Sequence, residues 1–190
     1  PNSLDGGNTT DWYCHQAIVS GSAGLDGHYE SLTNAGGIFE ALNASDQTGQ
    51  DIVMQLGCNS DAETGTHSLN GGNWNTLTIY PSKPLIVITA AAAGVFITLD
   101  GADDVSLDGR LNATGSTPGL TLPAIRFINT AQNNEFKYTD VTDDLKLSGN
   151  STVTAGGEVT VGKELIIDTG SELTISSDGT VSVNGIAVQP

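Results

Sequence analysis

The C-terminal part of the sequence consists of short alternating strands separated by turn residues. From Leu145 onward, apolar and polar residues alternate in runs of about four residues, each followed by Gly, Ser, Asn or Asp. Strand–turn units at short, regular intervals are typical of β-solenoids, in which each coil lies on the previous one. We therefore predict an all-β fold, a right-handed parallel β-helix in which residues 145–190 form a regular strand–turn tail.

The composition fits such a fold. Aromatic residues make up only 5% of the 190 residues, so Val, Ile, Leu, Ala and Thr must build the core, and 24 glycines supply tight turns. The length corresponds to one domain. We predict an N-terminal arm over residues 1–20 and a single β-helix domain over residues 21–190.

One segment has helical periodicity. In residues 33–45, Ile38, Phe39, Ala41 and Leu42 lie on one helical face, and Thr33 or Asn34 could cap its start. Terminal coils of a solenoid need a cover. We expect this helix to be an N-terminal cap over the first coil.

Strands are predicted between this helix and the tail. Their apolar residues alternate with polar ones, as expected where every second side chain points into the coil. Asn133 and Asn134 are candidates for hydrogen bonds to the backbone of an adjacent coil. The predicted strands cover residues 51–57, 75–81, 84–90, 95–101, 104–110, 124–130 and 134–141.

The order of several motifs resembles that of a known family. The segments GHYESLTNAGGIFEALN, DIVMQL, SLNGGNWNTLTIYPS, FITLDGADDVSLDGR and AIRFINTAQNNEFKY occur in turn over roughly residues 20–141. This order resembles secreted right-handed parallel β-helix surface proteins of the Bacteroidetes type. The resemblance implies the fold and a secreted or cell-surface location, but no particular activity. The chain departs from the family in being short and in its plain strand tail after Asp140.

The charge balance limits the classes of partner. There are 22 acidic residues against six Lys and Arg, a net charge of −16. Such a chain is poorly suited to neutralise nucleic-acid phosphates or to bind anionic membranes. No apolar run is long enough to cross a bilayer, so we expect no membrane insertion. The acidity suits an extracellular, soluble protein.

Cys14 and Cys58 are the two cysteines. A disulfide between them would pin the N-terminal segment to the first coils and requires an oxidising compartment. Free thiols are an alternative. A zinc site is a weaker one, because no C-x-x-C spacing is present.

The segment GADDVSLDG places several carboxylates close together in the sequence. Clustered carboxylates could bind calcium or serve as paired acids in glycan chemistry. Asp-Gly pairs also make turns, and this is the simpler interpretation. Arg110 follows Asp108 by two residues, which is typical of an ion pair. The candidate calcium ligands are Asp100, Asp103, Asp104 and Asp108.

Two further kinds of candidate site concern glycans. Trp74, in a turn entering a strand, could stack on a sugar, although packing against the cap is the simpler role. N-x-S/T sequons would be glycosylated only in a host that has the machinery. They begin at Asn8, Asn43, Asn112 and Asn150.

No catalytic residue set stands out, so we do not expect an enzyme. An open solenoid end leaves unpaired backbone groups that favour another strand. We therefore predict an extracellular structural subunit of a homopolymeric filament or surface assembly, formed by end-to-end stacking with itself. The alternative is a carbohydrate-binding or adhesive module, and a glycan-active enzyme is a third, weaker hypothesis.

Overall fold

The computed structural model describes residues 14–185 and is built mostly of strands. The first strands are β1 (Ala17–Ser20), β2 (Gly27–Tyr29), β3 (Asp51–Leu56), β4 (Ser60–Glu63), β5 (Leu69–Asn70) and β6 (Thr76–Pro81). The middle strands are β7 (Ile86–Ala90), β8 (Phe96–Asp100), β9 (Val105–Asp108), β10 (Leu120–Leu122) and β11 (Ala124–Ile128). The last strands are β12 (Asn134–Val141), β13 (Leu145–Leu147), β14 (Thr152–Ile167), β15 (Glu172–Ile175) and β16 (Thr180–Gly185). The all-β prediction is confirmed.

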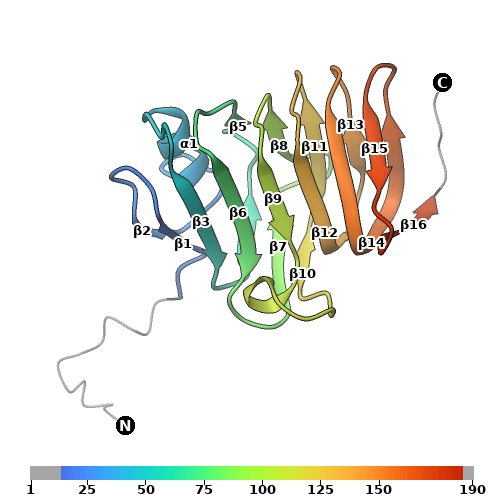
Figure 1. The fold of residues 1–190 in the computed structure, drawn as a ribbon. Helices are drawn as coiled ribbons and strands as arrows, with labels where there is room; N and C mark the ends of the chain where they lie inside the picture. Colours follow the sequence, from blue (N-terminus) through green and yellow to red (C-terminus); the bar gives the residue numbers. More distant parts are fainter. Residues whose placement is uncertain (1–13, 186–190) are drawn as a thin grey trace, which may run out of the picture.

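The strands follow one another along the length of the molecule, from the N-terminal end to the C-terminal end (Figure 1). The ladders from β3 onward are parallel, whereas β1 pairs antiparallel with both β2 and β3, so the sheet is mixed. The predicted arm therefore ends in a strand of this sheet, because residues 17–20 form β1.

The parallel pairings form three series. The first joins β3, β6, β9, the start of β12, the start of β14 and β15. The second joins β4, β7, β10, the end of β12, the middle of β14 and β16. The third joins β5, β8, β11, β13 and the end of β14.

Hydrogen bonds of side chains, on or next to neighbouring strands of a series, recur at characteristic sequence separations. The separation is 25 residues for Thr76 and Asp51 and 29 residues for Ser106 and Glu135. It falls to 20 residues for Thr142 and Leu122 and for Ser151 and Ser171. The chain therefore returns to each series at longer intervals near its N-terminal end than in its tail.

Alternate residues of each strand form the core, as the period of two predicts. In the first series, Met54, Ile79, Leu107, Phe136 and Ala155 stand opposite one another in register, and all are buried. Phe127 packs edge-on against Phe136, with ring centroids 6.4 Å apart. Asn134 lies within this core, where its amide bonds to the backbone of Ala102 and Val105, as predicted for that residue.

The predicted cap helix is shorter than the periodicity indicated. Helix α1 spans Ile38–Asn43 and buries Ile38, Phe39 and Leu42. Its N-cap is Gly37, because Thr33 and Asn34 use their side chains elsewhere: Thr33 bonds Glu63, and Asn34 accepts from Thr64. The helix lies at the N-terminal end of the molecule (Figure 1).

The tail also differs from the prediction of uniformly short strands. β14 runs for 16 residues and takes part in all three series. Glycines let it bend between them, since Gly157 has a φ of 60°. The regular strand–turn pattern is otherwise present through β15 and β16.

Candidate functional site

A groove of about 470 Å³ lies on the outer face of β6, β9 and β12. Strand alternation creates it, because the residues between the core positions point outward. The ladder places Thr78 opposite Ser106, Ser106 opposite Glu135, and Asp108 opposite Lys137. The full lining is Thr76, Thr78, Asp104, Val105, Ser106, Asp108, Arg110, Ala113, Asn133, Glu135 and Lys137.

The most constrained contact in the groove joins Asp108 and Arg110. The Arg110 guanidinium donates from Nε to Oδ1 at 2.9 Å and from Nη2 to Oδ2 at 2.6 Å. The Asp108 side chain is only 3% exposed. Hydrogen bonding to Asp108 raises the pKa of Arg110 above its ordinary value. The sequence prediction of an ion pair is confirmed.

Arg110 has two more contacts that fix its position. Its guanidinium carbon lies 4.9 Å from the centre of the Tyr138 ring, within cation–π range. Its Nη1 donates to the carbonyl of Gly115 at 3.3 Å. The latter contact ties the groove to the loop that contains the 3₁₀ helix Leu111–Ala113.

Lys137 completes a network of paired charges. Its Nζ lies 2.7 Å from Glu135 Oε2 and 3.9 Å from Asp108 Oδ2. Ser106 donates to the same Glu135 oxygen at 3.2 Å. Two cations and two carboxylates therefore neutralise one another in the groove.

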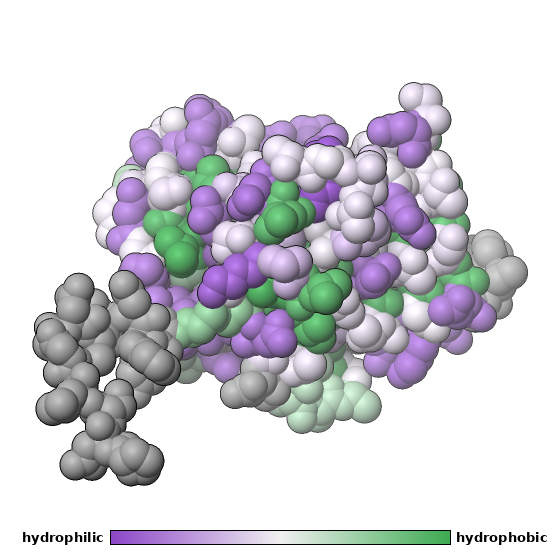
Figure 2. Space-filling view, turned by 90° about the horizontal axis from the view of Figure 1, so that it is seen from below, coloured by the Kyte–Doolittle hydropathy of each residue, from purple (hydrophilic) through white to green (hydrophobic). Residues whose placement is uncertain are grey.

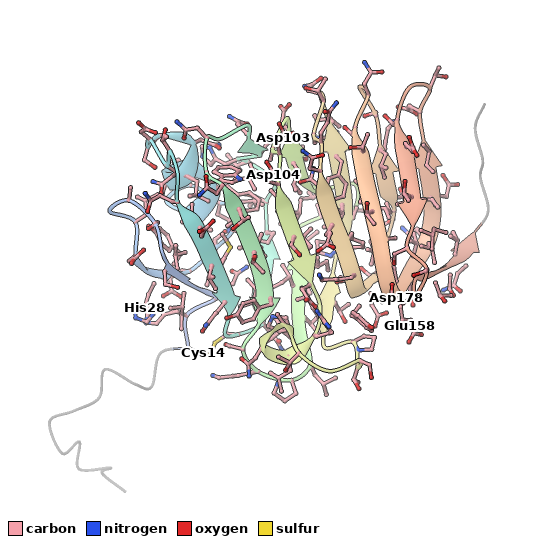
Figure 3. The ribbon with its side chains drawn as sticks, viewed as in Figure 1. Cys14, His28, Asp103, Asp104, Glu158 and Asp178 are labelled. Carbon is pink, nitrogen blue, oxygen red and sulfur yellow. A yellow bond between two sulfur atoms is a disulfide. The ribbon has the colours of Figure 1, made fainter. Side chains whose placement is uncertain are left out.

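The four predicted calcium ligands lie on different parts of this region. Asp100 accepts from Asn129, Asp103 accepts from the backbone of Gln132, and Asp108 pairs with Arg110. Asp103 and Asp104 occupy the turn before β9 (Figure 3). Within residues 14–185, no three His, Cys, Asp or Glu side chains are grouped as metal ligands. The four do not converge, and Asp104, with a φ of 56°, serves the turn.

Trp74 is a packing residue in this structure. It is 6% exposed, and its indole N–H donates to the carbonyl of Asp103 at 2.9 Å. Gly72 lies directly over the ring, where an added Cβ would come within 2.0 Å of it. Although Trp74 borders a second hollow of about 370 Å³, its ring offers little surface to a sugar.

The sequons lie at turns in the described part of the chain. Asn43 ends α1, donates to the carbonyl of Ser68 and accepts from the backbone of Asn70. Asn112 and Asn150 are exposed and have positive φ angles. Asn8 lies outside the described residues.

Cys14 and Cys58 form a disulfide, in agreement with the prediction. The bridge closes a sequence separation of 44 residues and holds the segment before β1 against the turn after β3. Its Cys14 end lies at the N-terminal end of the molecule (Figure 3). Disulfides are typical of proteins that fold in oxidising compartments. Among residues 14–185, no helix has the length and apolar character to cross a membrane.

Sequence reasoning missed Glu63, a buried carboxylate near the N-terminal end of the molecule. Glu63 is fully buried and accepts hydrogen bonds from the side chains of Gln16, Ser31 and Thr33 and from the backbone of Leu32 and Thr33. Its local sequence, SDAETG, has the polar composition of an exposed turn, and nothing in it signals burial.

Comparisons with family models, with curated proteins and with solved structures found no match. The resemblance to secreted β-helix surface proteins of the Bacteroidetes type therefore stays a prediction.

Proposed function

We propose that this chain is a right-handed parallel β-helix that serves as a structural subunit of an extracellular homopolymer. The three parallel series and the recurring sequence separations support the β-helix, because each coil would contribute one strand to each series. Parallel crossovers are almost always right-handed. The disulfide supports an oxidising, extracellular location.

The observation that carries the proposal concerns one row of inward-facing residues in the first series. This row is buried along most of its length but exposed at its C-terminal end. Met54, Ile79, Leu107, Phe136 and Ala155 are all at most 4% exposed, but Ile175, the next residue in register, is 52% exposed. Leu173, Val181 and Val183, which continue the buried positions of β14, are only partly buried. In residues 14–185, β15 and β16 each pair on one side only, with β14.

The opposite end has its apolar side chains covered, but it also has an edge strand: within residues 14–185, β2 pairs on one side only, with β1. α1 buries its apolar side chains there, and Ile52, Met54 and Leu56 of β3 have no exposed surface. On the face seen from below, hydrophobic residues form separate patches among hydrophilic ones (Figure 2). Among residues 14–185, the C-terminal edge therefore combines backbone groups without a strand partner on one side with apolar surface, which is the combination that favours strand addition by a second copy.

Electron microscopy and sedimentation of the purified chain test this proposal. We expect filaments in which the C-terminal edge of one copy pairs with the β2 edge of the next, because a contact between two different surfaces that does not close extends indefinitely. Ile175→Lys should reduce the assembled fraction at least tenfold, since lysine on an edge strand opposes pairing. Leu85→Lys is the matched control. Leu85 is 77% exposed, but it directly precedes β7 and does not lie on the C-terminal edge strands.

Three results would contradict the proposal. Monomers at high protein concentration would exclude assembly through this edge. Closed dimers would mean that two copies meet through a two-fold contact, which cannot extend into a filament. An Ile175→Lys variant that assembles like the Leu85→Lys control would place the contact elsewhere.

A further inference from the structure

We infer that the groove over β6, β9 and β12 binds a neutral oligosaccharide. β14 separates the groove strands from the edge strands β15 and β16, so this inference is independent of the assembly proposal. Its volume of about 470 Å³ is within the usual range of about 300–1,000 Å³ for small-molecule sites.

The paired charges favour an uncharged ligand. Arg110 is satisfied by Asp108, and Lys137 by Glu135 and Asp108, so neither cation needs an anionic ligand. Asp104 adds a further carboxylate to the lining. The chain's net charge of −16 also repels polyanions such as uronate polymers.

The polar groups of the lining match a ligand rich in hydroxyl groups. Thr76, Thr78 and Ser106 present hydroxyls; Thr76 and Ser106 already donate to Asp51 and Glu135, so these two offer acceptor positions to a ligand. Glu135 adds carboxylate oxygens, and its side chain in the Lys137 pair is 50% exposed. Sugar hydroxyls both donate and accept hydrogen bonds, so a carbohydrate can bond to the hydroxyl and the carboxylate groups of the lining alike.

The groove is also held in place before any ligand binds. Its side chains project from three strands in register, and the Asp108–Arg110 and Glu135–Lys137 pairs restrict the longest of them. A preformed site loses less side-chain freedom on binding. Arg110 lies over a face of the Tyr138 ring and the lining holds no aromatic residue, so recognition here rests on hydrogen bonds rather than on aromatic stacking.

Native affinity electrophoresis tests the inference, because the acidic chain migrates readily in such gels. The gels contain one polysaccharide each: xyloglucan, glucomannan, mixed-linkage β-glucan, or the anionic polygalacturonate. We expect retardation by at least one neutral polymer and none by polygalacturonate. Retention by polygalacturonate alone, or by no neutral polymer in the set, overturns the inference.

Matched variants locate the binding. Ser106→Tyr fills the groove and should weaken retardation at least tenfold in apparent affinity, and Thr78→Tyr should do the same from the neighbouring strand. Thr154→Tyr is the control, because Thr154 is the next outward residue in register after Glu135 but lies outside the lining. Circular dichroism confirms that each variant is folded. Undiminished retardation of folded Ser106→Tyr and Thr78→Tyr overturns the assignment to this groove.

Discussion

At the scale of single residues, Glu63 joins three segments that are distant in the sequence. Gln16 comes from the start of the chain, Ser31 to Thr33 come from the loop before α1, and Glu63 itself ends β4. Burial by itself raises the pKa of a carboxyl group. The hydrogen bonds from Thr33, Leu32 and Gln16 outweigh burial here and lower the pKa of Glu63 below its ordinary value of 4.5.

Glu63→Gln should therefore destabilise the protein and alter its response to acid. Both native carboxylate oxygens of Glu63 accept hydrogen bonds, whereas the NH₂ group of a glutamine would face the same donors without an acceptor. We therefore expect a loss of about 2–4 kcal/mol in the free energy of unfolding at pH 7. A group whose folded pKa is lowered stabilises the protein above its ordinary pKa and loses this effect as pH falls through the folded pKa. Chemical denaturation between pH 7 and pH 3 measures both effects.

The pH profile separates a titration effect from a general loss of stability. Wild-type protein should lose stability steeply below about pH 4.5, and Glu63→Gln should show a shallower decline, since it has no charge to lose there. Glu158→Gln, on an exposed position of β14, should follow the wild-type profile. Parallel profiles for Glu63→Gln and wild type would contradict the role given to the Glu63 carboxylate.

Residue-level predictions from sequence succeeded where the partners are close in the chain. The Asp108–Arg110 pair spans two residues of an extended segment, so both side chains point to one face. Glu63 depends on donors about 30 to 47 residues away, and no local pattern encodes them. For Trp74, burial favours a packing role over stacking on a sugar, and its indole N–H bonds to Asp103, in the turn before β9, whereas packing against the cap stays a prediction.

At the scale of strands, Gly109 controls how closely β9 approaches β12. A Cβ at this position would lie 1.7 Å from the carbonyl oxygen of Tyr138 and 2.8 Å from Thr139 Oγ1. Tyr138 has a φ of 50°, and the register between β12 and β14 shifts there. The absence of a side chain at Gly109 therefore permits the bend in β12 between the first and second series.

Gly109→Ala should lower the free energy of unfolding by about 2–3 kcal/mol, because the clash is with backbone that cannot move aside. Gly156→Ala is the matched control. Its Cβ would meet nothing closer than Ser176 Oγ at 3.3 Å, so we expect a much smaller change. Thermal denaturation of both variants makes the comparison, and equal melting temperatures would contradict the backbone clash as the cause.

The strands with strong alternation were predicted closely, and the short ones were not. The predicted range 51–57 corresponds to β3, and 134–141 coincides with β12. β1, β2, β4, β5 and β10 were missed, because strands of two to four residues seldom show a period of two. α1 is shorter than predicted because tertiary hydrogen bonds hold Thr33 and Asn34 outside the helix.

At the scale of the whole molecule, the sequence alone predicted the all-β class because turn residues and alternation recur throughout the chain. The interval between equivalent strands was harder to predict. The local patterns in the tail indicate about 20 residues per coil, which holds for β14 and β15 but not for the separations of 25 to 29 residues nearer the N-terminal end. Loop insertions such as the segment between β9 and β10 lengthen those steps without changing the strand pattern.

The net charge of −16 gives the assembly proposal a test by ionic strength. Acidic copies repel one another, and Glu158 and Asp178 lie near the C-terminal edge itself (Figure 3). The Debye length falls from about 30 Å at 0.01 M salt to about 8 Å at 0.15 M, so salt should reduce the repulsion and leave the apolar contact intact. We expect the assembled fraction to rise with sodium chloride over this range in light scattering. The Ile175→Lys variant should stay small throughout, and dissociation of the wild type by salt would mean that ion pairs, rather than the apolar edge, hold the copies together.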